Sequence, residues 1–293
     1  MELVSSTLHG EPAIGRDGAG TSFAAPKVAH IAARLQSFFP DVSPLLYRAL
    51  IVQSARWPAW AETATDKDRV LRLIGYGRPD LARATTNAAT RVTLITAKER
   101  ELAGKQYHLF VVRIPEELHG PAQEANIRID VTLAYTAEPR RTRARNRSYL
   151  ETWLEWESSR RGEPIADFRH RIEHGEASHR AKFPWVLDDR DDRGDVEGTN
   201  RTRGSVQKDW AVFPAYDLPA EFAIAVRGHL GWNHRAGEGK ARYCLVVSFE
   251  ALDGQVQIYE AIRAEIEAET QVDSSVEVQV ASAGSSGPQS TEP

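Results

Sequence analysis

The stretch Gly-Thr-Ser-Phe-Ala-Ala-Pro at residues 20–26 lies where a turn-rich N-terminal segment passes into a helix. Glycines are frequent before it, and the small and apolar residues that follow, up to about Phe39, have a spacing that predicts a helix from Ser22. A serine at the start of a helix lies beside unpaired N–H groups and the positive end of the helix dipole, which stabilise developing negative charge. Ser22 is therefore a candidate nucleophile, although such a serine is more often only a helix cap.

Residues 20–29, Gly-Thr-Ser-Phe-Ala-Ala-Pro-Lys-Val-Ala, resemble the serine signature of the subtilisin-like serine proteases, the subtilases of peptidase family S8. The order of the later features is also similar to that family: a proline-containing turn at 39–44, a second helix at 45–55, and a Gly-Tyr-Gly turn at 75–77 that leads to a last helix. The resemblance covers residues 1–86. It implies an α/β subtilase catalytic-domain fragment, C-terminal helices only, in which Ser22 attacks a polypeptide substrate and forms an acyl-enzyme.

A serine nucleophile needs a general base and a carboxylate that orients this base. In subtilases both lie well upstream of the serine, whereas 21 residues precede Ser22 here. His9 is followed by glycine, as in the family, but it lies too near the serine and lacks the helix that should follow; Asp17 is interpreted as a turn residue, and His30 as a surface residue where the family usually has glycine. We therefore expect a truncated, nearly inert catalytic domain, or a split protease that another chain completes.

The same resemblance implies that the parallel sheet beside the serine helix is mostly encoded upstream. The helix over 22–39 is apolar on nearly every face, a pattern typical of a buried helix. Without that sheet, this helix has little to pack on. We therefore expect the chain by itself to expose hydrophobic surface along residues 23–39.

Beyond residue 86 the sequence changes from helical to β patterns. Runs of β-branched and aromatic residues between turn signals predict an antiparallel sandwich, an all-β accessory domain over 87–270. Aromatic residues at 149, 153 and 156 predict an amphipathic helix within an insertion near 148–180. Residues 271–293 are rich in Ser, Gly, Gln and Pro, and we expect a disordered tail. The predicted strands are 91–96, 107–114, 127–135, 221–226 and 243–250.

Three segments of this β region, 204–211, 224–232 and 243–250, are similar to the C-terminal region of certain large bacterial subtilases. Some of those are encoded next to an AAA-type ATPase, so the resemblance implies an ATPase partner. The alternative hypothesis is a non-catalytic β-sandwich interaction module that follows a vestigial protease segment.

Composition narrows the remaining function classes. The net charge of −4 gives no global attraction to nucleic acid or anionic membrane, and no apolar run is long enough for a spanning helix. The single cysteine, Cys244, excludes an internal disulfide framework and a cysteine-based zinc site, and we expect it to be buried. The start of the chain lacks the pattern of a signal peptide. We therefore expect a cytoplasmic protein without membrane or nucleic-acid partners.

Three further groups of charged residues or histidines are possible binding sites. The acidic run at 188–197 could bind calcium, but arginines at 190 and 193 oppose a cation, so we favour a solvated loop and expect no cofactor. The arginines between 140 and 147 are interpreted as a mobile charged loop. Three histidines, His170, His174 and His179, lack a metal-ligand spacing and are predicted to lie on the surface.

Overall fold

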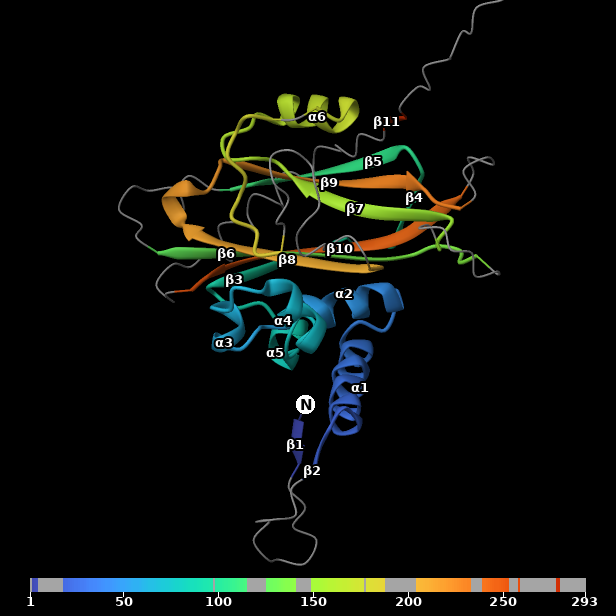
Figure 1. Ribbon diagram of the computed structural model, residues 1–293, viewed down its shortest axis with the longest axis vertical. Coiled ribbons are helices and arrows are strands. Elements are labelled where there is room, and N and C mark those ends of the chain that lie inside the picture. Colours follow the sequence, from blue (N-terminus) through green and yellow to red (C-terminus); the bar gives the residue numbers. More distant parts are fainter. Residues whose placement is uncertain are drawn as a thin grey trace, which may run out of the picture.

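Two antiparallel sheets stacked face to face form the centre of the protein, with most helices packed below the lower sheet and one above the upper sheet (Figure 1). This computed structural model describes residues 2–4, 18–96, 98–114, 125–140, 149–176, 178–187, 204–232, 239–252, 258 and 278–279. The expected β-sandwich is confirmed. The proposed domain boundaries at 86 and 270 stay predictions.

The N-terminal part consists of a short hairpin and five helices. Ser43 caps α2 by accepting a hydrogen bond from the N–H of Leu45 at 3.1 Å, and Pro44 occupies the first turn. Asp80 caps α5 in the same way, with the N–H of Arg83 at 2.8 Å. The predicted helices correspond to α1, α2 and α5, whereas α3 and α4 were not predicted. The elements are β1 (Glu2–Val4), β2 (Gly18–Gly20), α1 (Thr21–Phe38), α2 (Pro44–Ser54), α3 (Ala59–Glu62), α4 (Lys67–Ile74) and α5 (Leu81–Thr85).

The lower sheet has the order β3-β10-β6-β8, with β4 also paired to β10, and the upper sheet has the order β11-β5-β9-β7. All five predicted strands are present. A helix, α6, covers the upper sheet, and a 3-10 turn, η3, follows β8. The elements are β3 (Arg91–Ile95), β4 (Arg100–Ala103), β5 (Gln106–Arg113), β6 (Asn126–Thr136), β7 (Thr152–Ser158), α6 (Ile165–His174), β8 (Val206–Pro214), η3 (Ala215–Asp217), β9 (Glu221–Leu230), β10 (Lys240–Ala251) and β11 (Val278–Gln279).

The predicted helix within residues 149–156 is wrong, because residues 152–158 form strand β7. Leu154 and Trp156 point into the sandwich core, while Trp153 and Glu155 alternate with them. The spacing of these few aromatic residues does not distinguish a helix from a short strand. The segment forms a strand because it pairs with β9. The helix of the insertion is α6, which begins at Ile165. The predicted disordered tail lies outside the described residues except for Val278 and Gln279, which pair with β5.

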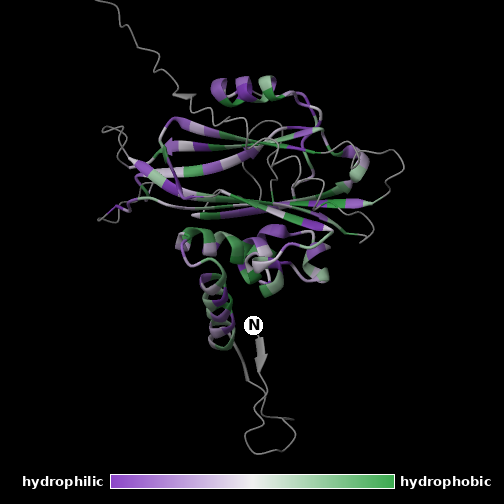
Figure 2. Ribbon diagram, turned by 180° about the vertical axis from the view of Figure 1, so that it is seen from behind, coloured by the Kyte–Doolittle hydropathy of each residue, from purple (hydrophilic) through white to green (hydrophobic). Residues whose placement is uncertain are grey.

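The sandwich core lies between the two sheets and is almost wholly apolar. Alternate residues of each long strand point inward, and Figure 2 shows the corresponding alternation of hydrophobic and hydrophilic segments along the strands. Aromatic rings fill the centre; Phe222 contacts Phe183 and Phe249 edge to face at 5.6 and 5.9 Å between ring centroids. The upper face of the lower sheet is therefore buried mainly by apolar packing, and the amide of Gln207 donates a hydrogen bond across to the Leu154 carbonyl at 2.6 Å.

The opposite face of the lower sheet is covered by helices and is partly polar. Lys208 on β8 has no exposed surface, and burial lowers its pKa to about 7 against the pull of Asp130. Its ammonium lies at the C-terminal end of α2, where backbone carbonyls lack helical partners and the dipole is negative. It donates hydrogen bonds to three of them, those of Val52, Gln53 and Ala55, at 3.1, 3.0 and 2.6 Å.

Asp130 on β6 is the anion of this buried cluster. Its carboxylate lies 2.9 Å from Arg56, 3.0 Å from Arg128 and 3.4 Å from Lys208. Burial by itself would raise the pKa of Asp130, but Arg128, Lys208 and Arg56 together lower it to about 2. Gln53 extends the network by donating to the Asp130 carbonyl at 2.9 Å and to Ser248 at 2.8 Å. The network therefore joins α2 to strands β6, β8 and β10.

Helix α1 is covered at one end only. Ile31 and Leu35 are buried against α2 and the lower sheet, whereas Phe23, Val28 and Phe38 are 42%, 36% and 50% exposed. The helix extends below the other helices in Figure 1, next to the short β1–β2 hairpin. The expected exposure of apolar surface along residues 23–39 is thus confirmed for the first half of α1.

We predict that Lys208→Met lowers the free energy of unfolding by about 3 kcal/mol, because it removes one cation from a buried cluster and one hydrogen-bond donor from each of three buried carbonyls. Urea unfolding curves measure this. Arg72→Met is the matched control, because the Arg72–Asp68 pair is an exposed i,i+4 pair at 2.7 Å, with about 0.5 kcal/mol at stake. Equal midpoints for the two variants would contradict a structural role for Lys208.

Amide hydrogen exchange should be faster in the first half of α1 than in α2. Amides of residues 27–29 in α1 should exchange much faster than those of residues 48–54 in α2, because the first half of α1 has few buried contacts. Exchange of the monomer, followed residue by residue, gives the comparison. Equal protection of both helices in a monomer would mean that α1 is covered by something other than the described residues.

Candidate active site

Ser22 is the second residue of α1 and follows strand β2 directly after Thr21. Its side chain is exposed. The helix start was expected from the glycines at 18 and 20, which lie in β2 opposite Val4 and Glu2. A serine at a strand-to-helix junction stands clear of the sheet edge and beside the free N–H groups of the first helical turn. The expected position of Ser22 at the start of the helix is confirmed, whereas its role as a nucleophile stays a prediction.

Pro26 has a specific effect on this helix start. It is the sixth residue of α1 and lacks an N–H group, so the Ser22 carbonyl has no helical donor four residues on. A proline inside a helix normally destabilises it, and here it lies immediately after the turn that carries the serine. The first turn is therefore less restrained by the helix than a regular turn would be.

No general base accompanies Ser22 in the described part of the chain, where no side chain bonds to its hydroxyl. His30 is the nearest histidine along α1, but eight residues correspond to about 12 Å of helix. It is exposed, as expected for a surface residue. His9 and Asp17 lie outside the described residues. The structure therefore brings no described histidine or carboxylate to the nucleophile.

The other described histidines lie on or in the sandwich, on the far side of the lower sheet from α1 (Figure 1). His108 points toward Tyr243, with 2.6 Å between its Nδ1 and the phenol oxygen. His170 and His174 stack on the exposed side of α6 at 4.1 Å between ring centroids, which confirms their surface position. Within the described segments no group of three potential metal ligands occurs. The acidic run at 188–197 and the arginines at 141–147 lie outside the described residues.

The shortest contact between a histidine and a carboxylate in the described segments joins His229 to Glu155. His229 on β9 lies 2.7 Å from Glu155 on β7 through its Nε2, and the Trp153 ring stacks on it at 3.8 Å. Arg227 lies 3.7 Å from Glu157 and 4.0 Å from Glu155, so an arginine also faces these carboxylates. These strands form the upper sheet, opposite the α1 side. The pair cannot serve Ser22 of the same chain.

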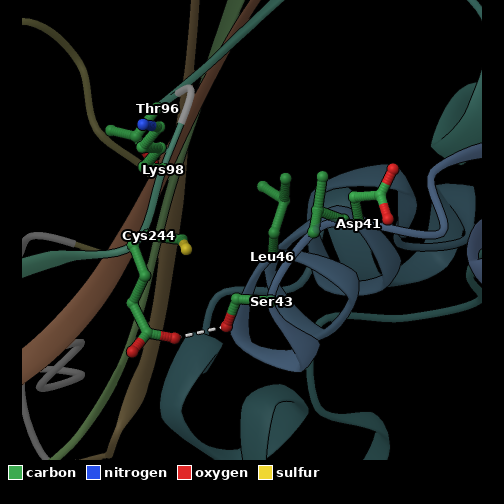
Figure 3. A pocket seen from close by; sticks show the side chains of 8 residues that line it. Asp41, Ser43, Leu46, Thr96, Lys98 and Cys244 are labelled. Carbon is green, nitrogen blue, oxygen red and sulfur yellow. Dashed lines mark hydrogen bonds between the residues drawn. The ribbon is translucent and has the colours of Figure 1, made fainter.

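A hollow of about 340 Å³ opens where the loop between α1 and α2 meets the lower sheet (Figure 3). Ser43 faces it and donates a hydrogen bond to Glu99, which also pairs with Arg242 at 2.9 Å. The lining combines a polar rim with apolar residues beneath it. The residues are Asp41, Val42, Ser43, Leu46, Thr96, Lys98, Glu99 and Cys244.

Cys244 does not make this hollow a reaction centre. The side chain is buried, as expected, and burial raises the pKa of the thiol to about 11, although a hydrogen bond with Thr96 lowers it. A thiol with such a pKa stays protonated at neutral pH and is a poor nucleophile. Ser43 is likewise engaged as the cap of α2. The hollow therefore lacks an activated nucleophile.

The sequence did not indicate the residues that hold α2 against the lower sheet, which are Lys208 and Asp130. Lys208 and Asp130 occur in predicted or quoted β segments, where polar residues alternating with apolar ones indicate a solvent-facing side. In the structure that side is covered by α2 and the loop after it. The only feature of the sequence that could have indicated this buried pair was a charged residue of each sign on two β segments.

The comparisons with known proteins bear on the N-terminal segment and on the sandwich. Residues 13–77 match the model of the subtilase family. An uncharacterised protein, y4bN, of Sinorhizobium fredii (strain NBRC 101917 / NGR234) is 29% identical over 257 residues, which cover 86% of this chain. The chain spans 57% of the length of that relative. The second match is longer than residues 1–86, so it extends into the sandwich.

None of the helices in the described part of the chain is long and apolar enough to cross a membrane. The family match includes Ser22, the first two long helices and the Gly-Tyr-Gly turn, which are the features that resembled the family in the sequence. The helices that the structure shows there follow the expected order. Residues 13–77 of this chain are therefore similar to the subtilase family.

Proposed function

We propose that this chain supplies the nucleophile-bearing part of a subtilisin-like serine endopeptidase, with Ser22 as the nucleophile. The observation that carries the proposal is the exposed serine at the junction of β2 and α1, within the segment that matches the subtilase family. The general base and the orienting carboxylate come from residues outside the described part of the chain. They lie either upstream in a longer product or in another chain.

The proposed chemistry has two steps. The Ser22 hydroxyl oxygen attacks the carbonyl carbon of a peptide bond while the base takes its proton, and the resulting oxyanion lies near the free N–H groups at the start of α1. The base then gives the proton to the leaving amine, and an ester on Ser22 remains. Water activated by the same base hydrolyses this ester and restores the serine. Each step requires the missing base.

The uncovered half of α1 supports this arrangement. Phe23 and Val28 expose apolar surface on the same helix as Ser22, and a helix of this composition is normally covered. A sheet or partner that covers this half of α1 would also lie next to the serine. In this proposal, the same segment covers the exposed half of α1 and supplies the groups that activate Ser22.

By itself the chain should have almost no activity. Loss of the histidine from a triad lowers kcat by about a million-fold, a value that belongs to subtilisin itself and is not inferred from this chain. The second candidate function, a non-catalytic interaction module, rests on the absence of a base beside Ser22 among the described residues. The sandwich would then bind a partner, and the expected AAA-type ATPase stays a prediction under either hypothesis.

Labelling with a fluorophosphonate probe tests the proposal, because the probe reacts only with an activated serine. The pure chain should remain unlabelled, and the product expressed with its upstream in-frame coding region, or with the neighbouring genes, should be labelled on Ser22. Ser22→Ala should abolish this labelling. Ser37→Ala, an exposed serine on the same helix, should leave it unchanged.

Two outcomes would contradict the proposal in different ways. Labelling of Ser22 in the pure chain would show that the base lies within it. A folded longer product that stays unlabelled, and that does not cleave an unfolded casein substrate, would favour the non-catalytic module.

A further inference from the structure

We propose that His170 and His174, in the last turn of α6, form a two-histidine site for a divalent transition-metal ion. Their rings stack at 4.1 Å between centroids with 24° between the ring planes, and both side chains are exposed. Residues four apart on a helix lie on the same face, and paired histidines at this spacing bind zinc in other proteins. The sequence did not indicate a metal here; the structure adds the partners of the second ring nitrogen of each histidine.

His174 has the tautomer that a metal ligand requires. Its Nδ1 lies 2.9 Å from the carbonyl oxygen of His170. A carbonyl oxygen only accepts hydrogen bonds, so Nδ1 carries the proton and donates it. The lone pair of the neutral ring is therefore on Nε2, and this nitrogen is able to bind a metal ion.

His170 is oriented in a similar way by a carboxylate. Its Nδ1 lies 3.4 Å from Oε2 of Glu176, which follows the end of the helix. Metal-binding histidines usually direct one ring nitrogen to a carboxylate or a backbone carbonyl, which fixes the tautomer and makes the other nitrogen a better ligand. The pair has one partner of each kind. The Nε2 atoms of both rings are therefore the nitrogens left for a metal ion.

The inner face of α6 holds this pair on a rigid support. Phe168 and Ile172 are buried in the apolar cluster beneath the helix. Arg171 is also buried, lies 2.8 Å from Glu163 and pairs with Glu157. A site on an anchored helix keeps its ligands together, while exposed histidine rings remain able to turn toward one ion.

The charge at this end of α6 favours a cation. His174 is the last residue of the helix, and Gly175 ends it in a left-handed conformation with a φ of 68°. The C-terminal end of a helix dipole is negative, so a positive ion is stabilised there. The carboxylate of Glu176 adds a negative charge beside His170.

Glu173 lies between the two histidines in the sequence but does not belong to the site. It accepts a hydrogen bond from the Tyr107 hydroxyl at 2.6 Å and pairs with Arg169 at 3.2 Å. A carboxylate engaged in this way is not available as a base for a metal-bound water. The site therefore binds a metal ion without hydrolytic chemistry.

The ligand atoms select the kind of ion. Imidazole nitrogen suits Cu²⁺, Ni²⁺ and Zn²⁺, whereas Mg²⁺ and Ca²⁺ prefer oxygen ligands. Among the described residues no third potential ligand joins the pair, so water or a group of another molecule completes the coordination. Affinity should follow the usual order of these ions, with Cu²⁺ bound most tightly.

Calorimetric titration of the full, tag-free chain with Cu²⁺ tests the proposal. His170→Gln and His174→Gln should each weaken binding by at least about tenfold, the lower limit for loss of a group that merely supports a ligand. His30→Gln is the matched control, because it removes an exposed histidine from α1, and it should leave the affinity unchanged. Equal affinity of all these variants and the unchanged chain would overturn the proposal.

Electron paramagnetic resonance of the Cu²⁺-loaded chain identifies the ligands directly. The unchanged chain should show coupling of the copper to two imidazole nitrogens, and either single variant should show coupling to one. Coupling to two nitrogens that persists when both His170 and His174 are replaced by glutamine would overturn the proposal. Neither measurement depends on Ser22, so both are independent of the proposed protease function.

Discussion

The ammonium group of Lys208 at the C-terminal end of α2 is the interaction on which the arrangement of helices and sandwich depends. A strand of the sandwich supplies the cation, and a helix of the subtilase-like segment supplies the three carbonyls that accept its hydrogen bonds. Asp130 balances the charge and connects it to Arg56 and Arg128. A buried cluster of this kind stabilises the fold only when every member is present, because each lost partner leaves another buried group unsatisfied.

This constraint fixes α2, and α2 in turn fixes one end of α1. Leu35 and Ile31 pack in the same apolar cluster as Leu46 and Leu50 of α2 and Val246 of β10. The end of α1 that carries Ser22 has no comparable contacts. The sandwich thus holds α1 by its far end, and the end that carries Ser22 is exposed.

The sequence predicted the features that depend on local chemistry. Ser43 followed by Pro44 predicted the start of α2, and β-branched runs predicted β6 and β10, because capping and strand propensity act over a few residues. The position of Ser22 at the start of α1 was predicted for the same reason, since it depends on the glycines and the helix next to it. The segment 149–156 was misassigned because its few aromatic residues fit both periods.

The buried network could not be predicted, because its partners are far apart in the chain. Lys208 is more than 150 residues from the carbonyls that it binds, and its role appears only when β8 pairs with β6 beneath α2. The surroundings of Ser22 are unpredictable for a different reason: the groups that would activate it are not among the described residues. Local sequence gives the position of a reactive group, whereas tertiary pairing gives its environment.

The central claim is that the subtilase-like helices and the sandwich fold as one unit through the Lys208 network. Differential scanning calorimetry of the full chain tests it most directly, because a single cooperative unit gives one transition whose calorimetric and van't Hoff enthalpies agree. We predict one such transition for the pure monomer. Two separate transitions, with the lower one lost when residues 1–86 are cleaved away, would contradict the claim.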